Sequence, residues 1–216
     1  MGTLDELQKL IPVIRQTLSL DEGVMKSIPD DLIMLAFIPR DYDLPFEVAR
    51  ELLRKYGYKN YEFFEFWGDQ VLGLIVVQAL YERKEVSELS VYHNLKVILT
   101  GNSILNCLMT NKQLCKDKDF YTKTCADQFE AILGSIYWYL YYKLDYKDAF
   151  EIIFQWYKKT WDFDTIISAL QGRGSHPCVR PLESPKKVIY SHKFKAPKLI
   201  YRPVEHQSPT EEFSQF

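Results

Sequence analysis

Residues 62–81 read EFFEFWGDQVLGLIVVQALY, a stretch without lysine, arginine or proline. After Glu62 it holds only four polar side chains, which are Glu65, Asp69, Gln70 and Gln78. A helix that is apolar on nearly every side is typical of a protein core. The stretch therefore predicts a buried central helix around which the rest of the fold is arranged.

Helical periodicity continues on both sides of this central stretch. The hydrophobic fraction of 47% is large enough for a buried core. Apolar residues recur at helical spacing, between capping or helix-breaking residues, in several further segments. These segments are 4–18, 32–38, 45–55, 87–99, 102–112, 122–142 and 147–161. The sequence therefore predicts an all-α body over residues 1–170.

The composition changes at Gly172. Six of the ten prolines lie beyond it, and residues 171–216 carry 8 Lys and Arg against 4 Asp and Glu. Residues 1–170 carry 19 Lys and Arg against 25 Asp and Glu. We therefore expect a basic, proline-rich C-terminal extension over 171–216 with little regular structure. Its two strand-like runs, 186–190 and 198–202, would form at most a short β-hairpin.

Acidic residues occur on the central helix where apolar residues are expected. Glu62, Glu65 and Asp69 are spaced so that they fall within roughly 60° of one another around a helix. Burying ionised carboxylates is costly unless they are paired or bind a metal. The stretch offers no basic partner of its own, although acids on a helix are more often solvated surface groups.

A second acidic pair, Asp127 and Glu130, lies in another apolar segment without basic residues. Two such helices facing each other would collect carboxylate oxygens into a site for a hard cation such as Mg²⁺. The glycines beside the acids, Gly68, Gly73 and Gly134, would let the helices approach closely. Spacing alone leaves the metal site and the solvated-surface interpretation about equally favoured.

Two segments resemble the sequence motifs of the ribonuclease III family. Residues 62–69, EFFEFWGD, resemble its signature, and residues 126–137, ADQFEAILGSIY, resemble its second acidic motif. The likeness covers about residues 5–165. It implies the ribonuclease III endonuclease fold and Mg²⁺-dependent cleavage of double-stranded RNA, with Mn²⁺ able to substitute. The implied products carry 5′-phosphate and 3′-hydroxyl ends with short 3′ overhangs, as in RNA processing or small-RNA biogenesis.

The resemblance also assigns roles to individual residues. Glu62 would be an accessory acid beside the metal site. The family works as a homodimer, and Phe66 would fill a pocket of the partner subunit, with ordinary core packing as the alternative. The four implied metal ligands are Glu65, Asp69, Asp127 and Glu130.

The chain departs from the family pattern in several places. Phe63 replaces a usual base, Trp67 replaces leucine, and the early Thr-His-Arg-Ser segment is lost at residues 37–40. Family members usually carry a double-stranded-RNA-binding domain at their C-terminus, for which residues 171–216 are too few. A catalytically silent, RNA-scaffolding relative is the first alternative, and an unrelated helical interaction module is the second. The presence of all four implied ligands favours the enzyme.

The basic extension is the candidate replacement for the missing RNA-binding domain, because bases neutralise phosphates and release counterions. A disordered basic tail, with an import signal around Lys186 and Lys187, is the alternative. The candidate RNA-binding residues are Arg173, Arg180, Lys186, Lys187, Lys193, Lys195, Lys198 and Arg202.

The remaining motifs predict an intracellular protein, nuclear or cytoplasmic. Cysteines 107, 115, 125 and 178 show no CxxC spacing, which indicates reduced thiols and makes a zinc site unlikely. His93 is better explained as a structural histidine than as a general base. The longest strongly apolar run, 71–77, is too short to span a bilayer, so we expect no membrane partner.

Overall fold

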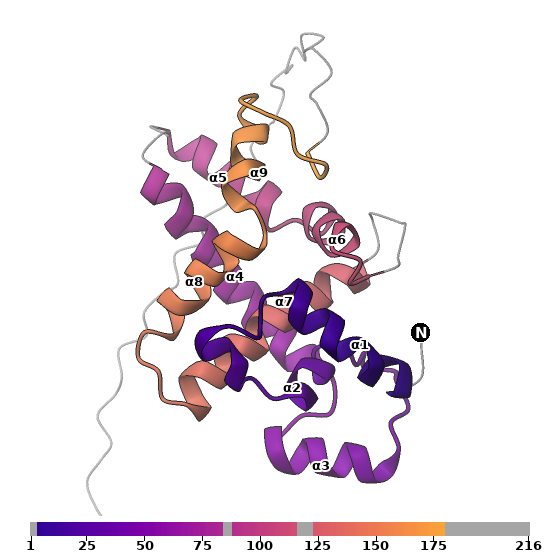
Figure 1. Cartoon of the computed structure of the whole chain (residues 1–216). Helices are drawn as coiled ribbons and strands as arrows, with labels where there is room; N and C mark the ends of the chain where they lie inside the picture. Colours follow the sequence, from indigo (N-terminus) through magenta and orange to yellow (C-terminus); the bar gives the residue numbers. More distant parts are fainter. Residues whose placement is uncertain (1–3, 84–87, 116–122, 180–216) are drawn as a thin grey trace, which may run out of the picture. The chain divides into compact units, whose positions relative to one another are not determined.

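The computed structural model describes residues 4–83, 88–115 and 123–179. Over these residues the regular structure is helical, apart from one isolated bridge between His176 and Val179, so the all-α prediction is confirmed for them. The elements (Figure 1) are α1 (Leu4–Thr17), η1 (Gly23–Ser27), α2 (Asp30–Leu35), α3 (Phe46–Tyr56), α4 (Glu62–Arg83), α5 (Leu89–Leu99), α6 (Asn102–Asn111), α7 (Lys123–Trp138), η2 (Tyr139–Lys143), α8 (Ala149–Thr160) and α9 (Phe163–Leu170).

The two acidic helices, α4 and α7, cross at the centre of the fold (Figure 1). Their closest approach is at Gly68 and Gly134. A Cβ atom on Gly68 would lie 1.8 Å from the carbonyl oxygen of Glu130, and one on Gly134 would lie 2.0 Å from that of Phe64. Neither position has room for a side chain, so these two glycines set the distance between the helices.

Gly73 does not take part in this crossing, contrary to the prediction that it would. A Cβ atom there would meet only the end of the Lys96 side chain, at 3.6 Å from its Cε. Gly73 lies more than a helical turn beyond Gly68 and on the side of α4 that faces α5.

The core is built on α4 and α7. Phe64, Leu72 and Ile75 of α4 are fully buried, and Phe129 and Leu133 of α7 are nearly so. Each such side chain contributes about 1.5–3 kcal/mol by its removal from water. The predicted central helix is therefore confirmed. Its length and composition alone would also allow it to cross a membrane, a property that it shares with core helices in general.

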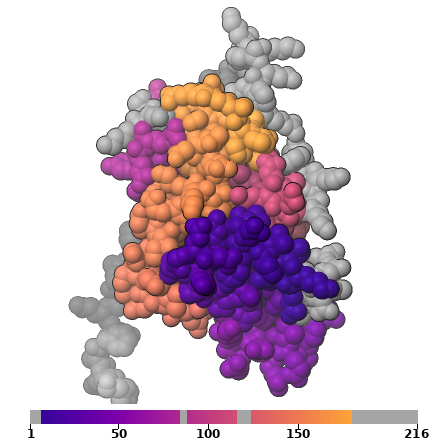
Figure 2. Space-filling model, in the orientation of Figure 1, coloured from indigo at the N-terminus to yellow at the C-terminus, as the bar shows by residue number. Residues whose placement is uncertain are grey.

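The N-terminal segment packs against α8. The indole Nε1 of Trp156 donates a hydrogen bond to the carbonyl oxygen of Leu18 at 2.7 Å, and Lys159 forms an ion pair with Glu22 at 2.9 Å. Figure 2 shows this indigo segment on the surface beside the orange α8. These contacts join the segment that follows α1 to α8.

The cysteines correct a sequence-based prediction. Cys107 is bonded to Cys178 and Cys115 to Cys125, with Cα–Cα distances of 5.5 and 6.0 Å. Both distances lie within the ordinary range for disulfides. The expectation of four separate reduced thiols is therefore wrong for this structure. The first bond fastens the segment after α9 to α6, and the second joins the end of α6 to the start of α7.

The chain stays in contact with the helical body past the composition change at Gly172, in turns and one isolated bridge. The amide of Arg173 donates to the carbonyl of Ser168 at 2.8 Å, and Cys178 is bonded to α6. Residues 171–179 thus pack with the body, although they were assigned to the extension. The two strand-like runs, 186–190 and 198–202, lie outside the described residues.

Candidate metal centre

The first half of the site is the N-terminal part of α4. Asn60 precedes the helix, and its side-chain oxygen accepts a hydrogen bond from the amide of Glu62 at 3.1 Å. This local contact satisfies one of the free amides at the start of the helix. Glu65 and Asp69 follow one turn apart and project from the same side of α4.

The second half is the first part of α7, where Asp127 and Glu130 are only 7% and 8% exposed. Both acids lie in the stretch of α7 that approaches α4. The contact of Gly68 with the Glu130 backbone places the acidic part of each helix opposite the other. The two acid pairs, far apart in the sequence, are thereby brought to one place.

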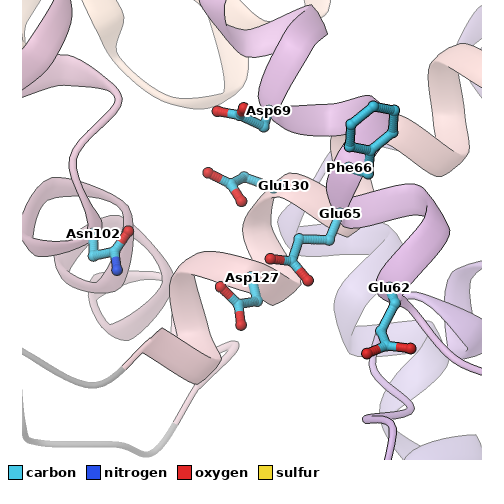
Figure 3. Close-up of a pocket in the computed structure, with 7 residues that line it drawn as sticks. All are labelled: Glu62, Glu65, Phe66, Asp69, Asn102, Asp127 and Glu130. Atoms are coloured by element: carbon cyan, nitrogen blue, oxygen red, sulfur yellow. The ribbon is translucent and has the colours of Figure 1, made fainter.

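Three carboxylates form the closest group. One ligand oxygen from each of Glu65, Asp127 and Glu130 lies within 4.8 Å of the others. Asp69 lies outside this group but lines the same cavity of about 360 Å³. Figure 3 shows all four carboxylates directed into this space, with Asn102 on its opposite side. The structure thus brings together all four acids that the resemblance identifies as metal ligands.

Glu62 also lines the cavity, but its carboxylate has other neighbours. It lies 3.6 Å from the guanidinium of Arg40 and 3.5 Å from the amide nitrogen of Asn60. In Figure 3 it is directed away from the other four acids. This position fits an accessory acid at the edge of the site.

Phe66 is exposed to 66% and lies at the edge of the cavity. Ordinary core packing, the alternative considered for this side chain, is therefore wrong. In Figure 3 the ring of Phe66 projects from α4 beside the carboxylates, and further exposed apolar residues follow along this helix.

Asn102 is the lining residue that the sequence analysis missed. It is the first residue of α6, and its side chain faces the carboxylates across the cavity (Figure 3). The only sequence signal is the pair Gly101–Asn102 at the start of a predicted helix, which is too common to indicate a site. His93 is exposed and does not line the cavity.

The donor set fits a hard divalent cation. Among the described residues, all the charged side chains that line the cavity are carboxylates. Carboxylate oxygens at this spacing, partly removed from water, are the ligands that Mg²⁺ and Mn²⁺ take in proteins. A cation bound there would offset the repulsion among these acids.

Of the eight candidate RNA-binding residues, only Arg173 lies within the described part of the chain. It belongs to the turn after α9 and lines neither the metal cavity nor its neighbour. The other seven lie outside the described residues, and they are Arg180, Lys186, Lys187, Lys193, Lys195, Lys198 and Arg202.

No family model, no curated protein and no solved structure matches the chain. Comparison with known proteins therefore assigns no function to this site.

Proposed function

We propose that the chain is a Mg²⁺-dependent endoribonuclease that cleaves double-stranded RNA, built on the ribonuclease III endonuclease fold. The observation that carries the proposal is the meeting of Glu65, Asp127 and Glu130 within 4.8 Å, from two helices that cross at glycine. The same residues belong to the two segments that resemble the family motifs. Its products would have 5′-phosphate and 3′-hydroxyl ends and short 3′ overhangs.

The carboxylates form a rigid, negatively charged site for a cation. Glu65, Asp127 and Glu130 would hold the cation, and Asp69 would complete its shell directly or through water. A bound Mg²⁺ or Mn²⁺ supplies an activated water and offsets charge on the scissile phosphate. Because α4 and α7 are locked together at Gly68 and Gly134, the ligands are positioned before substrate arrives.

The test is incubation with long duplex RNA and Mg²⁺, with products resolved on a gel. Glu130→Gln removes a charged ligand with little change in volume, so the cleavage rate should fall on the order of a hundredfold or more, at least as much as loss of an outer-shell partner costs. The matched control is Glu47→Gln, whose carboxylate is 70% exposed on α3 and pairs with Arg50. It should cut like the wild type.

Metal removal gives an independent arm of the same experiment. Excess chelator should abolish cleavage, and added Mg²⁺ or Mn²⁺ should restore it. Cleavage in excess chelator, or full activity in Glu130→Gln, contradicts the metal assignment. RNA binding without any cleavage favours the catalytically silent relative instead.

We also propose that the active form is a homodimer joined through α4. Its exposed apolar residues, Phe66, Leu74, Val77 and Tyr81, follow one another at helical spacing along one stripe. Two copies of α4 packed antiparallel about an axis near Gln70 would set each Phe66 opposite the partner's Leu74. The stripe is therefore self-complementary, as a two-fold interface requires.

A further inference from the structure

Helix α5 runs back along α4 and forms a second recess beside the metal cavity. The hydroxyl of Tyr92 donates to the carbonyl of Leu80 at 3.2 Å, and Lys96 lies over Gly73, nearer the acidic end of α4. The recess between the two helices has a volume of about 360 Å³. Asp69 lines both the recess and the metal cavity, so the two spaces adjoin at this residue.

The recess has a polar end and an apolar end. Lys96 of α5 and Thr100, which follows that helix, line it on one side, and Asp69 and Gln70 line it from α4. Leu74 and Val77, which belong to the exposed stripe of α4, line the other end. A partner molecule on the stripe and a ligand at the polar end would thus use different parts of the recess.

The Lys96 side chain extends over α4 at Gly73. A Cβ atom on Gly73 would lie 3.6 Å from the Cε of Lys96 and 3.7 Å from its Nζ, which is ordinary contact. The lysine therefore lies against α4, in the recess that Asp69 borders. Lys96 is exposed and has no ion-pair partner among the described residues.

Lys96 lies in a region where most of the charged side chains are acidic. Among the residues that the structure describes, five carboxylates line the metal cavity, and Lys96 is the one basic residue that lines either the cavity or the recess. A polyanionic backbone that reaches the carboxylates must also lay its neighbouring phosphates on this surface. An exposed ammonium group with no ion-pair partner in the described part of the chain is a suitable point charge for one of those phosphates.

We propose that the ammonium group of Lys96 forms a subsite for a backbone phosphate adjacent to the one that is cleaved. The subsite rests on the proposed function, because it takes RNA as the ligand and Asp69 as the boundary with the metal site. Lys96 is a positioning residue, since it holds the backbone in register without touching the reacting atoms. The competing explanation is that Lys96 only balances the charge of the carboxylates.

The experiment compares Lys96→Gln, Lys96→Arg and the control Lys9→Gln, an exposed lysine of α1. Binding to duplex RNA is measured against salt concentration in a Glu130→Gln background, which prevents cleavage. Lys96→Gln should weaken binding about tenfold, as expected for loss of a charged hydrogen bond. The slope of log affinity against log salt concentration should become shallower by about one for each Lys96–phosphate contact that is lost.

Cleavage kinetics separate positioning from metal binding. With Glu130 intact, Lys96→Gln should raise KM about tenfold with little change in kcat or in the Mg²⁺ concentration at half-maximal rate. Lys96→Arg should retain most of the affinity, and Lys9→Gln should match the wild type. An altered Mg²⁺ requirement with unchanged RNA affinity would overturn the subsite in favour of charge balance.

The two proposals fail in distinguishable ways. A wild-type protein that does not cut duplex RNA counts against the nuclease proposal, whatever Lys96 does. A wild-type protein that cuts, combined with a Lys96→Gln variant of unchanged affinity and salt slope, overturns the subsite alone. Circular dichroism of each variant checks the fold, which the exposed position of Lys96 should leave intact.

Discussion

Gly134 is the residue on which the geometry of the site depends most directly. Any Cβ atom there would meet the backbone of Phe64, which cannot move without shifting α4. Gly134→Ala should therefore lower the free energy of unfolding by about 3 kcal/mol, the upper part of the usual range for overpacking. It should also weaken Mg²⁺ binding, because the two ligand-bearing helices must separate. Urea unfolding and metal titration measure the two effects.

Gly73→Ala is the matched control on the same pair of helices. Its Cβ atom would be in ordinary contact with the flexible end of Lys96 at 3.6 Å. Alanine is favoured over glycine inside a helix by about 1 kcal/mol, so this variant should be as stable as the wild type or more so. Equal destabilisation by the two substitutions would contradict the close crossing.

At the residue scale the sequence predicts the identity of the acids better than their arrangement. The i, i+3 and i, i+4 spacing of Glu65, Asp69, Asp127 and Glu130 is enough to place each pair on one side of a helix. The register between the helices depends on packing, so spacing could not show that Asp69 lies outside the closest group of three. For the same reason the contact of Gly73 with Lys96 was not foreseen.

The two disulfides give a prediction at the scale of elements. Cys107 and Cys178 are 71 residues apart, and Cys115 and Cys125 are 10 apart. Loop-closure entropy predicts that breaking the first costs about 4 kcal/mol and the second about 3 kcal/mol. Thermal or urea unfolding of the Cys107→Ser/Cys178→Ser and Cys115→Ser/Cys125→Ser proteins measures these costs.

Peptide mapping without reductant checks the pairing itself. The expected cross-linked peptides join Cys107 to Cys178 and Cys115 to Cys125. Four free thiols in the purified, folded protein, or stabilities that do not respond to reductant, would restore the interpretation that the sequence favoured. Either result bears on the compartment in which the chain works, since disulfides persist in oxidising environments.

The elements themselves were largely predictable. The segments predicted from apolar periodicity contain or overlap α1 to α8, and Gly57 ends α3 in a left-handed conformation, as expected of a C-terminal glycine. Helix α9 was missed although Phe163, Ile166, Ile167 and Leu170 recur at helical spacing, because its eight residues are few and lie beside the composition change at Gly172. The cysteine pairing was missed because the partners are brought together by the fold and share no local motif.

At the scale of the whole molecule, the apolar stripe of α4 predicts self-association. Phe66→Ala should weaken the dimer by about 2 kcal/mol, or about thirtyfold in Kd, if this side chain is an anchor of the interface. The matched control is Phe46→Ala on α3, since Phe46 is 74% exposed and makes a cation–π contact with Arg50. Light scattering across a dilution series measures both variants. A monomeric wild type at micromolar concentration rules out this interface.

The basic extension provides the last prediction at this scale. Residues 1–170 carry 25 Asp and Glu against 19 Lys and Arg, so under the proposed function this body would need bound cations to hold the RNA backbone. The extension carries 8 Lys and Arg, and we propose that it supplies the missing phosphate contacts. The truncation that tests this follows Val179, because Cys178 is joined to the body through its bond to Cys107.

The truncated protein is best compared with the full chain in a Glu130→Gln background. It should bind duplex RNA much more weakly, and with a shallower salt dependence, because fewer counterions are released for each complex formed. A full-length variant with Lys186, Lys187 and Lys193 changed to Gln separates charge from chain length, and it should show part of the same loss. Unchanged affinity and slope after truncation would mean that the body alone holds the RNA. In that case the bases of the body, Lys96 among them, would have to account for the binding.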